Sequence, residues 1–452
     1  MHRKFSLIAI LFLHLFFLKS LQFTAWPEMT AFPYLLNHGF VTYRDMVHAY
    51  PPLLITVLSL IYKFLSYSQD AVKISGWSFI LISDFLIFLI IKKITNKFQI
   101  GIISLLGYVF LQTFLEGNMI WPDLAIIPFI LASVYLVLNK KYFFSGILIG
   151  LAFLTKQTGA LFIIPIFAFL ILEKEKNKKI ARYVVGVFVA IIPFLLILIR
   201  QNSFLDFLNW TIIYPSKYWI RFPGYVQTQL NLKQILIIAF IFIPIAFAVF
   251  LHNKILKDKI FLFLFLLLLV GIISVYPRFS FFHFQSAIAI TILIYGYLFA
   301  KIKNISKFLF IFIIPFLLVI TYFGIKKDWN KQTRFFENNN IVLASIIENK
   351  TQKDEKIYLL GLPANLYVLS NRLPPKPWLD NFGWYFEIPQ IQENTLESWK
   401  HDPPVAIFWQ NPQSGPWYEI GSYQPQKITN WIKKNYNREK EIQKGIWMWI
   451  KK

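Results

Sequence analysis

The segment 39–54, GFVTYRDMVHAYPPLL, holds four residues with reactive or ligand-binding side chains between two strongly apolar stretches. Arg44 and Asp45 place a cation beside a carboxylate. His48 adds an imidazole, and Tyr50 adds a phenol directly before two prolines. Polar groups of this kind are costly to hold at the face of a membrane, so they are functional candidates by default. We expect Arg44, His48 and Tyr50 to contact a substrate.

Two carboxylates, Glu28 and Asp45, share the polar region that follows the first apolar run. A carboxylate on a wall that excludes water keeps a proton affinity suited to a general base, and two carboxylates can divide the tasks of base and positioner. The alternative for Asp45 is an ion pair with its neighbour Arg44. For Glu28 the alternative is a solvated position at the interface, and the sequence leaves both alternatives open.

Asp123 and Lys156, in NMIWPDLAI and GLAFLTKQTG, lie where predicted helices begin or turn. The helix dipole and capping favour an Asp in a first helical turn, which explains Asp123 without any function. Lys156 lies at the tip of a tight helical hairpin. There it either binds an anionic lipid headgroup or extends its ammonium group to the interface.

Another cationic group occurs in VYPRFSFFHFQ, where Arg278 and His283 lie between two apolar runs. A guanidinium is well shaped for phosphate, so we expect this pair to bind a ligand. Lys217 and Arg221, in YPSKYWIRFPGY, are weaker candidates. The Trp and Tyr residues around them are typical of an interfacial belt.

Composition removes several other chemistries. The chain of 452 residues has no Cys, which excludes disulfides, thiolate nucleophiles and Cys-based metal sites. Its 7 His residues are scattered, and no nucleotide-binding motif is present, so we expect no cofactor and no metal centre, although a divalent ion is not excluded. The net charge of +23 comes largely from short basic clusters between apolar runs, which favours membrane topology over nucleic-acid binding.

The elements that must position these residues are apolar helices. Hydrophobic residues make up 56% of the chain and charged residues 15%, whereas soluble domains carry roughly 25% charged residues. The pattern predicts an α-helical polytopic membrane protein with about 11 transmembrane helices, several of them shorter than the ~20 residues that cross a bilayer. The apolar runs are 5–21, 71–91, 100–115, 124–138, 143–154, 158–172, 180–199, 234–251, 260–275, 286–300 and 308–323.

Loop charge predicts the orientation. His2, Arg3 and Lys4 place the N-terminus in the cytoplasm, and the first run is an uncleaved span because no small-residue cleavage site follows it. With this parity, five basic loops lie on the inner face of a plasma membrane, provided that the segment 51–66 runs along the outer face without crossing. The same parity places all the candidate residues in segments outside the membrane, namely 22–70, 116–123, the turn at 156–157, 201–233 and 276–285.

The tail, residues 324–452, differs in kind from the apolar runs. Short apolar stretches such as KIYLLGL and PVAIFW are broken by Pro and Gly, which is typical of a small α/β domain. We therefore predict two domains, a transmembrane domain over 1–323 and an extracytoplasmic α/β domain over 324–452.

The order of these motifs resembles that of GT-C type membrane glycosyltransferases, in the broad family of dolichyl-phosphate-mannose–protein mannosyltransferases and bacterial aminoarabinose transferases. The resemblance rests on the acidic residue soon after span one, YRDMVHAYPPL, NMIWPDLAIIP, GILIGLAFLTK and YPRFSFFH, in that order, followed by an outer C-terminal domain. It covers roughly residues 1–300, and the tail more loosely.

The resemblance implies a transferase that moves a hexose or pentose from a polyprenyl-phosphate carrier to a glycan, lipid or protein acceptor on the outer face. Lys156 and Arg278 would hold the leaving phosphate, with Arg44, His48, Tyr50, Asp123 and His283 as further donor-binding residues. Glu28 or Asp45 would take the acceptor proton, and attack opposite the phosphate would invert the anomeric centre. The rival interpretations are a transporter or flippase of lipid-linked sugars and a membrane scaffold.

Overall fold

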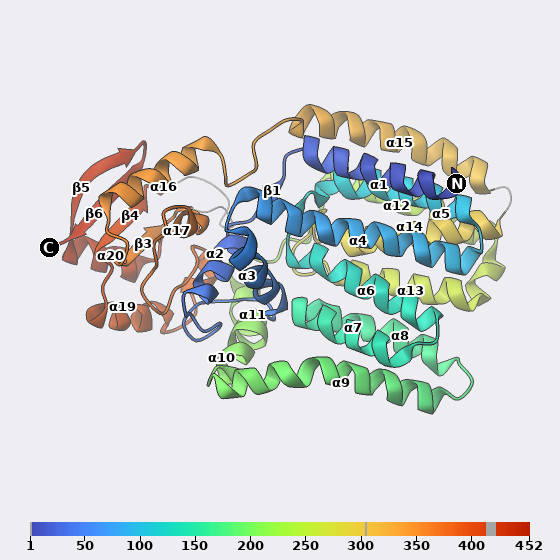
Figure 1. Ribbon diagram of the computed structural model, residues 1–452, viewed down its shortest axis with the longest axis horizontal. Helices are drawn as coiled ribbons and strands as arrows, with labels where there is room; N and C mark the ends of the chain where they lie inside the picture. Colours follow the sequence, from blue (N-terminus) through green and yellow to red (C-terminus); the bar gives the residue numbers. More distant parts are fainter. Residues whose placement is uncertain (1, 303–304, 413–421) are drawn as a thin grey trace. The chain divides into compact units, whose positions relative to one another are not determined.

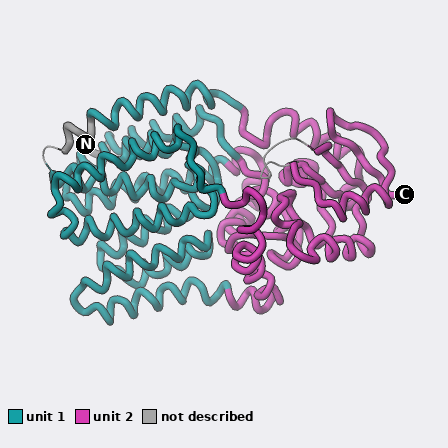
Figure 2. The backbone as a smooth tube through the Cα atoms, turned by 180° about the vertical axis from the view of Figure 1, so that it is seen from behind, with its two compact units in different colours: residues 1–24, 73–194, 227–331 teal, residues 25–72, 195–226, 332–452 magenta. Residues whose placement is uncertain are grey.

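The computed structural model describes residues 2–302, 305–412 and 422–452, and most of them are helical (Figure 1). The chain divides into two compact units (Figure 2). Unit 1 comprises residues 1–24, 73–194 and 227–331, and unit 2 comprises residues 25–72, 195–226 and 332–452. This division groups the tail with two earlier segments, so a separate domain over 324–452 stays a prediction.

Unit 1 is a bundle of apolar helices. Each of the eleven predicted apolar runs overlaps a helix of the structure. The helices are α1 (His2–Ser20), α4 (Gln69–Thr95), α5 (Phe98–Gln112), α6 (Pro122–Leu138), α7 (Tyr142–Thr155), α8 (Ile163–Ile171), α9 (Lys176–Arg200), α12 (Leu232–Leu251), α13 (Lys259–Ile273), α14 (Gln285–Lys301) and α15 (Ile305–Asp328).

Four helical segments among those searched in the described chain are long and apolar enough to cross a membrane. They are Gln69–Thr95, Phe98–Gly117, Lys176–Arg200 and Leu232–Leu251. Seven shorter apolar helices accompany them, among them Leu53–Leu65, which lies in the segment expected along the outer face. The structure therefore supports a polytopic membrane protein without fixing the count at eleven.

Glycines bring α7 and α9 of unit 1 into close contact. A Cβ atom on Gly146 would lie 2.0 Å from the carbonyl oxygen of Tyr183, and one on Gly186 would lie 2.0 Å from that of Phe143. Lipid tails are as apolar as these helices, so the hydrophobic effect does not drive the helices together. Small residues instead let the two backbones approach closely and gain van der Waals contact. The adjacent antiparallel pairs α6–α7 and α13–α14 complete the core that positions the loops at the helix ends.

Unit 2 contains a four-stranded sheet in the order β3-β4-β6-β5. Strands β3 (Ile357–Leu360) and β4 (Ala406–Gln410) are parallel, and β6 (Ile446–Lys451) is antiparallel to both β4 and β5 (Tyr436–Gln443). Its helices are α2 (Glu28–Asn37), α3 (Leu53–Leu65), α10 (Phe204–Leu208), α11 (Tyr214–Lys217), α16 (Asn338–Lys350), α17 (Asn365–Leu369), α18 (Gly383–Phe386), α19 (Ile391–His401) and α20 (Gln426–Asn435). Two short strands, β1 (Thr24–Ala25) and β2 (Met119–Ile120), occur outside this sheet.

The loop after α2 is tied to the tail by backbone hydrogen bonds within unit 2. The Trp378 N–H donates to the carbonyl of Asp45 at 2.9 Å, and the Val47 N–H donates to the carbonyl of Trp378 at 3.0 Å. Trp378 itself is buried. The N–H and the carbonyl of Trp378 thus both bond to the segment 45–47. These two hydrogen bonds fix the backbone of the YRD segment, although it forms no helix.

Candidate functional site

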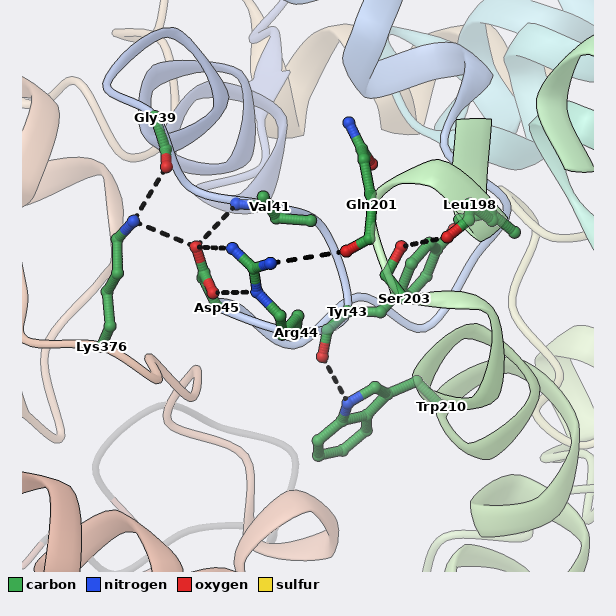
Figure 3. Close-up of polar contacts among 10 residues, drawn as sticks. All are labelled: Gly39, Val41, Tyr43, Arg44, Asp45, Leu198, Gln201, Ser203, Trp210 and Lys376. Atoms are coloured by element: carbon green, nitrogen blue, oxygen red, sulfur yellow. Dashed lines mark hydrogen bonds and ion pairs between the residues drawn. The ribbon is translucent and has the colours of Figure 1, made fainter. Parts of the chain in front are cut away.

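Asp45 is the centre of a hydrogen-bonded group in unit 2 (Figure 3). Its Oδ1 accepts from Arg44 Nε at 2.8 Å, and its Oδ2 accepts from the Val41 N–H at 3.1 Å and from Lys376 Nζ at 3.0 Å. Lys376 also donates to the carbonyl of Gly39 at 2.8 Å. The carboxylate thus lies between two cations, one adjacent in sequence and one 331 residues away.

These contacts decide the charge of Asp45. Burial alone raises the pKa of a carboxyl group, but the hydrogen bonds from Arg44, Val41 and Lys376 outweigh burial and hold the pKa of Asp45 below its usual value. Asp45 is therefore ionised at neutral pH. The ion pair with Arg44, which was the non-functional alternative for Asp45, is present in the structure.

The residue before this pair has an uncommon backbone. Tyr43 has φ 73°, in the left-handed region that non-glycine residues rarely adopt. Its carbonyl accepts from the Trp210 indole N–H at 3.1 Å, as Figure 3 shows, and its hydroxyl donates to the carbonyl of Tyr50 at 2.8 Å. A left-handed backbone costs free energy for a residue other than glycine, so it persists only where surrounding contacts enforce it. Such strained residues cluster at functional sites.

Glu28, His48 and Tyr50 belong to the same unit. Glu28 is the first residue of α2, where the helix dipole favours a carboxylate. It is only 6% exposed, so it does not occupy the solvated position that was its alternative. Burial lowers the pKa of His48 to about 3, so this imidazole is neutral at physiological pH. His48 can therefore donate a hydrogen bond to a ligand but supplies no positive charge.

Unit 1 has its own charged group, formed by Asp123, Lys156 and His283. Lys156 Nζ donates to Asp123 Oδ1 at 2.5 Å, and His283 Nδ1 lies 3.0 Å from Asp123 Oδ2. The three residues come from the first turn of α6, the end of α7 and the loop before α14. All three are buried. Asp123 lies in the first turn of α6 but is not its N-cap, which is Trp121, and its carboxylate contacts two other side chains.

The electrostatic field at His283 reflects its neighbours. Burial lowers the pKa of His283, the charge of Asp123 partly opposes this effect, and the positive charges of Lys156 and Arg278 add to it. Arg278 is therefore within electrostatic range of the cluster, in a loop whose backbone pairs with Gln227 through hydrogen bonds of 2.9 and 2.8 Å. The group thus brings two cations and an imidazole close to one carboxylate, that of Asp123.

Sequence reasoning missed several polar residues that the structure places in such groups. Lys376 and Asp380 of the tail carry no local signal, because each acquires its role through contacts with distant segments. Burial raises the pKa of Asp380 to about 7. By contrast, His14 and Asp84 lie within predicted spans, where an ionisable residue is by itself a sign of function. That signal could have found them.

A cavity in unit 2 has a volume of about 560 Å³ and a largely aromatic lining. Tyr218, Phe222, Trp384 and Tyr423 supply rings, and Arg221 and Glu387 supply charges of opposite sign. The next residue after Trp384, Tyr385, interacts electrostatically with Asp380, Tyr50 and Glu28. Arg221 thus lines a cavity, whereas Lys217 is not among the lining residues. Among the residues that the structure describes, no group of three or more His, Cys, Asp or Glu could hold a metal ion.

Comparison with known proteins finds one family model that matches part of the chain and solved structures of similar fold. The family described as dolichyl-phosphate-mannose-protein mannosyltransferase matches residues 47–199. The crystal structure of ArnT from Cupriavidus metallidurans bound to undecaprenyl phosphate aligns with a TM-score of 0.64 and 9% identity, over 98% of this chain and 97% of that chain. The apo ArnT from the same organism aligns with a TM-score of 0.49 and 11% identity, over 98% and 96%. No curated protein sequence matches significantly.

The fold and the family match together confirm the resemblance to the GT-C superfamily of membrane glycosyltransferases. More particularly, the chain resembles the mannosyltransferase family over residues 47–199 and has a fold similar to that of ArnT along nearly its whole length. The matched segment contains Asp123, Lys156 and the YPPL motif, whereas Glu28 and Asp45 precede it.

Proposed function

We propose that this protein is an integral membrane glycosyltransferase that moves a sugar from a polyprenyl-phosphate donor to an acceptor hydroxyl on the outer face of the inner membrane. The observation that carries the proposal is the buried Asp123–Lys156–His283 cluster, which lies at helix ends within a chain of GT-C fold. A lipid-linked donor is consistent with a binding group located where apolar helices end. It also agrees with the undecaprenyl phosphate in the matched ArnT structure.

In the proposed reaction the acceptor oxygen attacks the anomeric carbon as the bond between that carbon and the phosphate oxygen breaks. The leaving phosphate takes up negative charge, and we assign its stabilisation to Lys156 and Arg278. Preorganised cations of this kind commonly supply a large part of catalysis. Attack opposite the phosphate inverts the anomeric centre, and the hydroxyl proton passes to a carboxylate.

Asp45, Glu28 and Asp380 are the candidates for the carboxylate that takes this proton. A general base works best when its pKa lies near the working pH. The low pKa of Asp45 suits an ionised group that orients Arg44 and Lys376, whereas the raised pKa of Asp380 suits proton transfer. Glu28 is buried and interacts with the same tyrosine, Tyr385, as Asp380 does.

We assign the acceptor to the aromatic cavity of unit 2. Its volume lies within the range of ~300–1,000 Å³ that is usual for ligand pockets. Half-buried rings such as Tyr218 and Phe222 can pack on the apolar face of a sugar ring, while Arg221 and Glu387 hydrogen-bond to its polar edge. A hydroxyl-rich acceptor, such as a glycan or a glycolipid headgroup, fits this lining.

A transfer assay in membranes tests the proposal. Radiolabelled polyprenyl-phosphate hexose or pentose is offered to the wild type and to Glu28→Gln, Asp45→Asn and Asp380→Asn. We expect the wild type to move label onto a new product and at least one carboxylate variant to lose this activity. A folded, inserted wild-type protein that leaves every donor chemically intact, or three variants that all transfer normally, would contradict the transferase or the base assignment respectively.

A further inference from the structure

A chain of buried polar side chains runs through the helices of unit 1. His14 of α1 contacts Asp84 of α4 through Nδ1 at 2.6 Å, and its Nε2 lies 2.9 Å from Oε1 of Gln112, the last residue of α5. His14, Asp84 and Gln112 are each at most 1% exposed. The proposed phosphate site does not use them, because none belongs to the Asp123–Lys156–His283 cluster.

This pair is costly for a bundle of apolar helices. Asp84 is the sixteenth of 27 residues in α4, so it lies far from both helix ends. Ionisable groups at such depth are rare and are retained where they pair and serve a function. Replacing a buried ion pair by apolar residues is often neutral or even stabilising. Stability alone is therefore a poor reason for the presence of His14 and Asp84 in these helices.

The chain ends at a break in a helix. Gln112 directly precedes Thr113–Gly117, in which Leu115 (φ −111°, ψ 59°) and Glu116 (φ 58°, ψ 29°) leave helical geometry. The Gln112 side chain spans the break, because its Nε2 donates to the carbonyl of Gly117 at 2.8 Å. A Cβ atom at position 117 would lie 2.0 Å from the carbonyl oxygen of Gln112, so Gly is required there.

The break in turn contacts the loop that carries Arg278 and His283. The Glu116 carboxylate accepts from the Phe281 N–H at 3.2 Å, on the loop between α13 and α14. Gln285, at the start of α14, donates to the carbonyl of Leu115 at 2.5 Å. Leu115 and Glu116 thus contact the loop and the start of α14, and the Gln112 side chain spans the break in which both residues lie.

We propose that His14, Asp84 and Gln112 are positioning residues that fix the break at 113–117, so that Glu116 and Gln285 hold the loop carrying Arg278 and His283 in its binding geometry. The assignment of that loop to donor phosphate rests on the proposed function. The claim that the buried chain orders the loop does not, because it follows from contacts within unit 1 alone.

The decisive variant is His14→Leu/Asp84→Leu, which replaces the pair by apolar residues and leaves no unpaired charge. Loss of the pair itself should change thermal unfolding little, and the buried Gln112 Oε1, which loses its partner His14 Nε2, adds a modest cost. Amide hydrogen exchange at residues 279–284 should accelerate at least tenfold, and affinity for undecaprenyl phosphate in detergent micelles should fall roughly tenfold, or about 1.4 kcal/mol. Ser133→Ala is the matched control. It removes the buried hydrogen bond of 2.7 Å between Ser133 Oγ of α6 and Ser145 Oγ of α7. The control should leave both loop exchange and affinity unchanged.

A second pair of variants tests the other end without disturbing the helices. Glu116 is exposed, so Glu116→Ala should fold and should accelerate exchange at Phe281, whereas Glu116→Gln keeps an acceptor oxygen and should restore protection. Unchanged exchange in the double variant would by itself overturn the positioning role of His14 and Asp84, whereas unchanged exchange in Glu116→Ala would overturn the role of Glu116. Failure of the wild type to bind undecaprenyl phosphate would instead overturn the proposed donor, and the exchange result would still decide the role of His14 and Asp84.

Discussion

Two charged groups of this protein each centre on an aspartate, but their partners and their exposure to solvent differ. In unit 1, Asp123 contacts Lys156 and His283, and in unit 2, Asp45 contacts Arg44 and Lys376. The Asp123 and Lys156 side chains are 2% and 9% exposed, whereas those of Arg44 and Lys376 are 48% and 41% exposed. Solvent therefore screens the cations around Asp45 and hardly reaches those around Asp123.

Because of this difference in exposure, breaking the two groups should cost different amounts of folding free energy. Breaking a buried ion pair leaves an uncompensated charge and costs about 3–5 kcal/mol. An exposed pair contributes about 0–1 kcal/mol after screening. Rearranging the unit 1 cluster is therefore costly, whereas rearranging the cations around Asp45 costs little.

The largest effect is expected for Lys156→Met. This change leaves Asp123 buried with His283 as its remaining partner in the cluster, and unfolding free energy should fall by about 3–5 kcal/mol. Thermal unfolding in detergent measures the loss. The double variant Asp123→Asn/Lys156→Met, which removes both charges, should recover much of it. A single variant as stable as wild type would remove the contrast between the two groups.

Asp45→Asn should show the opposite pattern. We expect transfer activity to fall at least about 100-fold, the lower range for a lost acid–base or charge-orienting group, while the unfolding temperature changes by no more than a few degrees. The matched control is Asp402→Asn, because Asp402 of unit 2 also pairs with a lysine, Lys356, at an exposed site. Equal activity in the two variants would contradict a role for Asp45 in the reaction.

Asp380 predicts a pH dependence of stability. Its native pKa of about 7 exceeds the usual 3.8 because of burial, so the folded state holds a proton that the unfolded state releases. Stability should therefore decline as pH rises from about 4 to about 7 and level off above that. Asp380→Asn should flatten this decline in denaturant titrations between pH 5 and 8. An unchanged slope would place the titration elsewhere.

The smallest effect on stability is expected for Arg44→Ala. Loss of this half-exposed partner should cost less than about 1 kcal/mol. The pKa of Asp45 should nevertheless rise, because Arg44 is the first of the hydrogen-bond donors that lower it. The acidic limb of the pH–rate profile should accordingly move to higher pH, while Lys356→Ala, which removes the partner of Asp402, should leave the limb in place.

Part of this protein could be predicted from local sequence. The long apolar runs predicted helices because a helix satisfies all its backbone hydrogen bonds within one segment. The ordered motifs predicted the GT-C resemblance that the fold and family match confirm. The pairing of Arg44 with Asp45 was also open to prediction, since adjacent residues can meet within one turn of chain. These features depend on neighbours in sequence.

Tertiary structure decided which distant charges meet. Asp123 finds Lys156 33 residues away, Asp45 finds Lys376 331 residues away, and His14 finds Asp84 and Gln112 at separations of 70 and 98. Periodicity places each of these residues on a helix or in a loop but says nothing of its partner. Whether a charge is buried, and so whether its pKa and its energetic cost change, depends on those partners. Helix packing and long-range chain closure therefore determined the sites, whereas composition and pattern determined the class of fold.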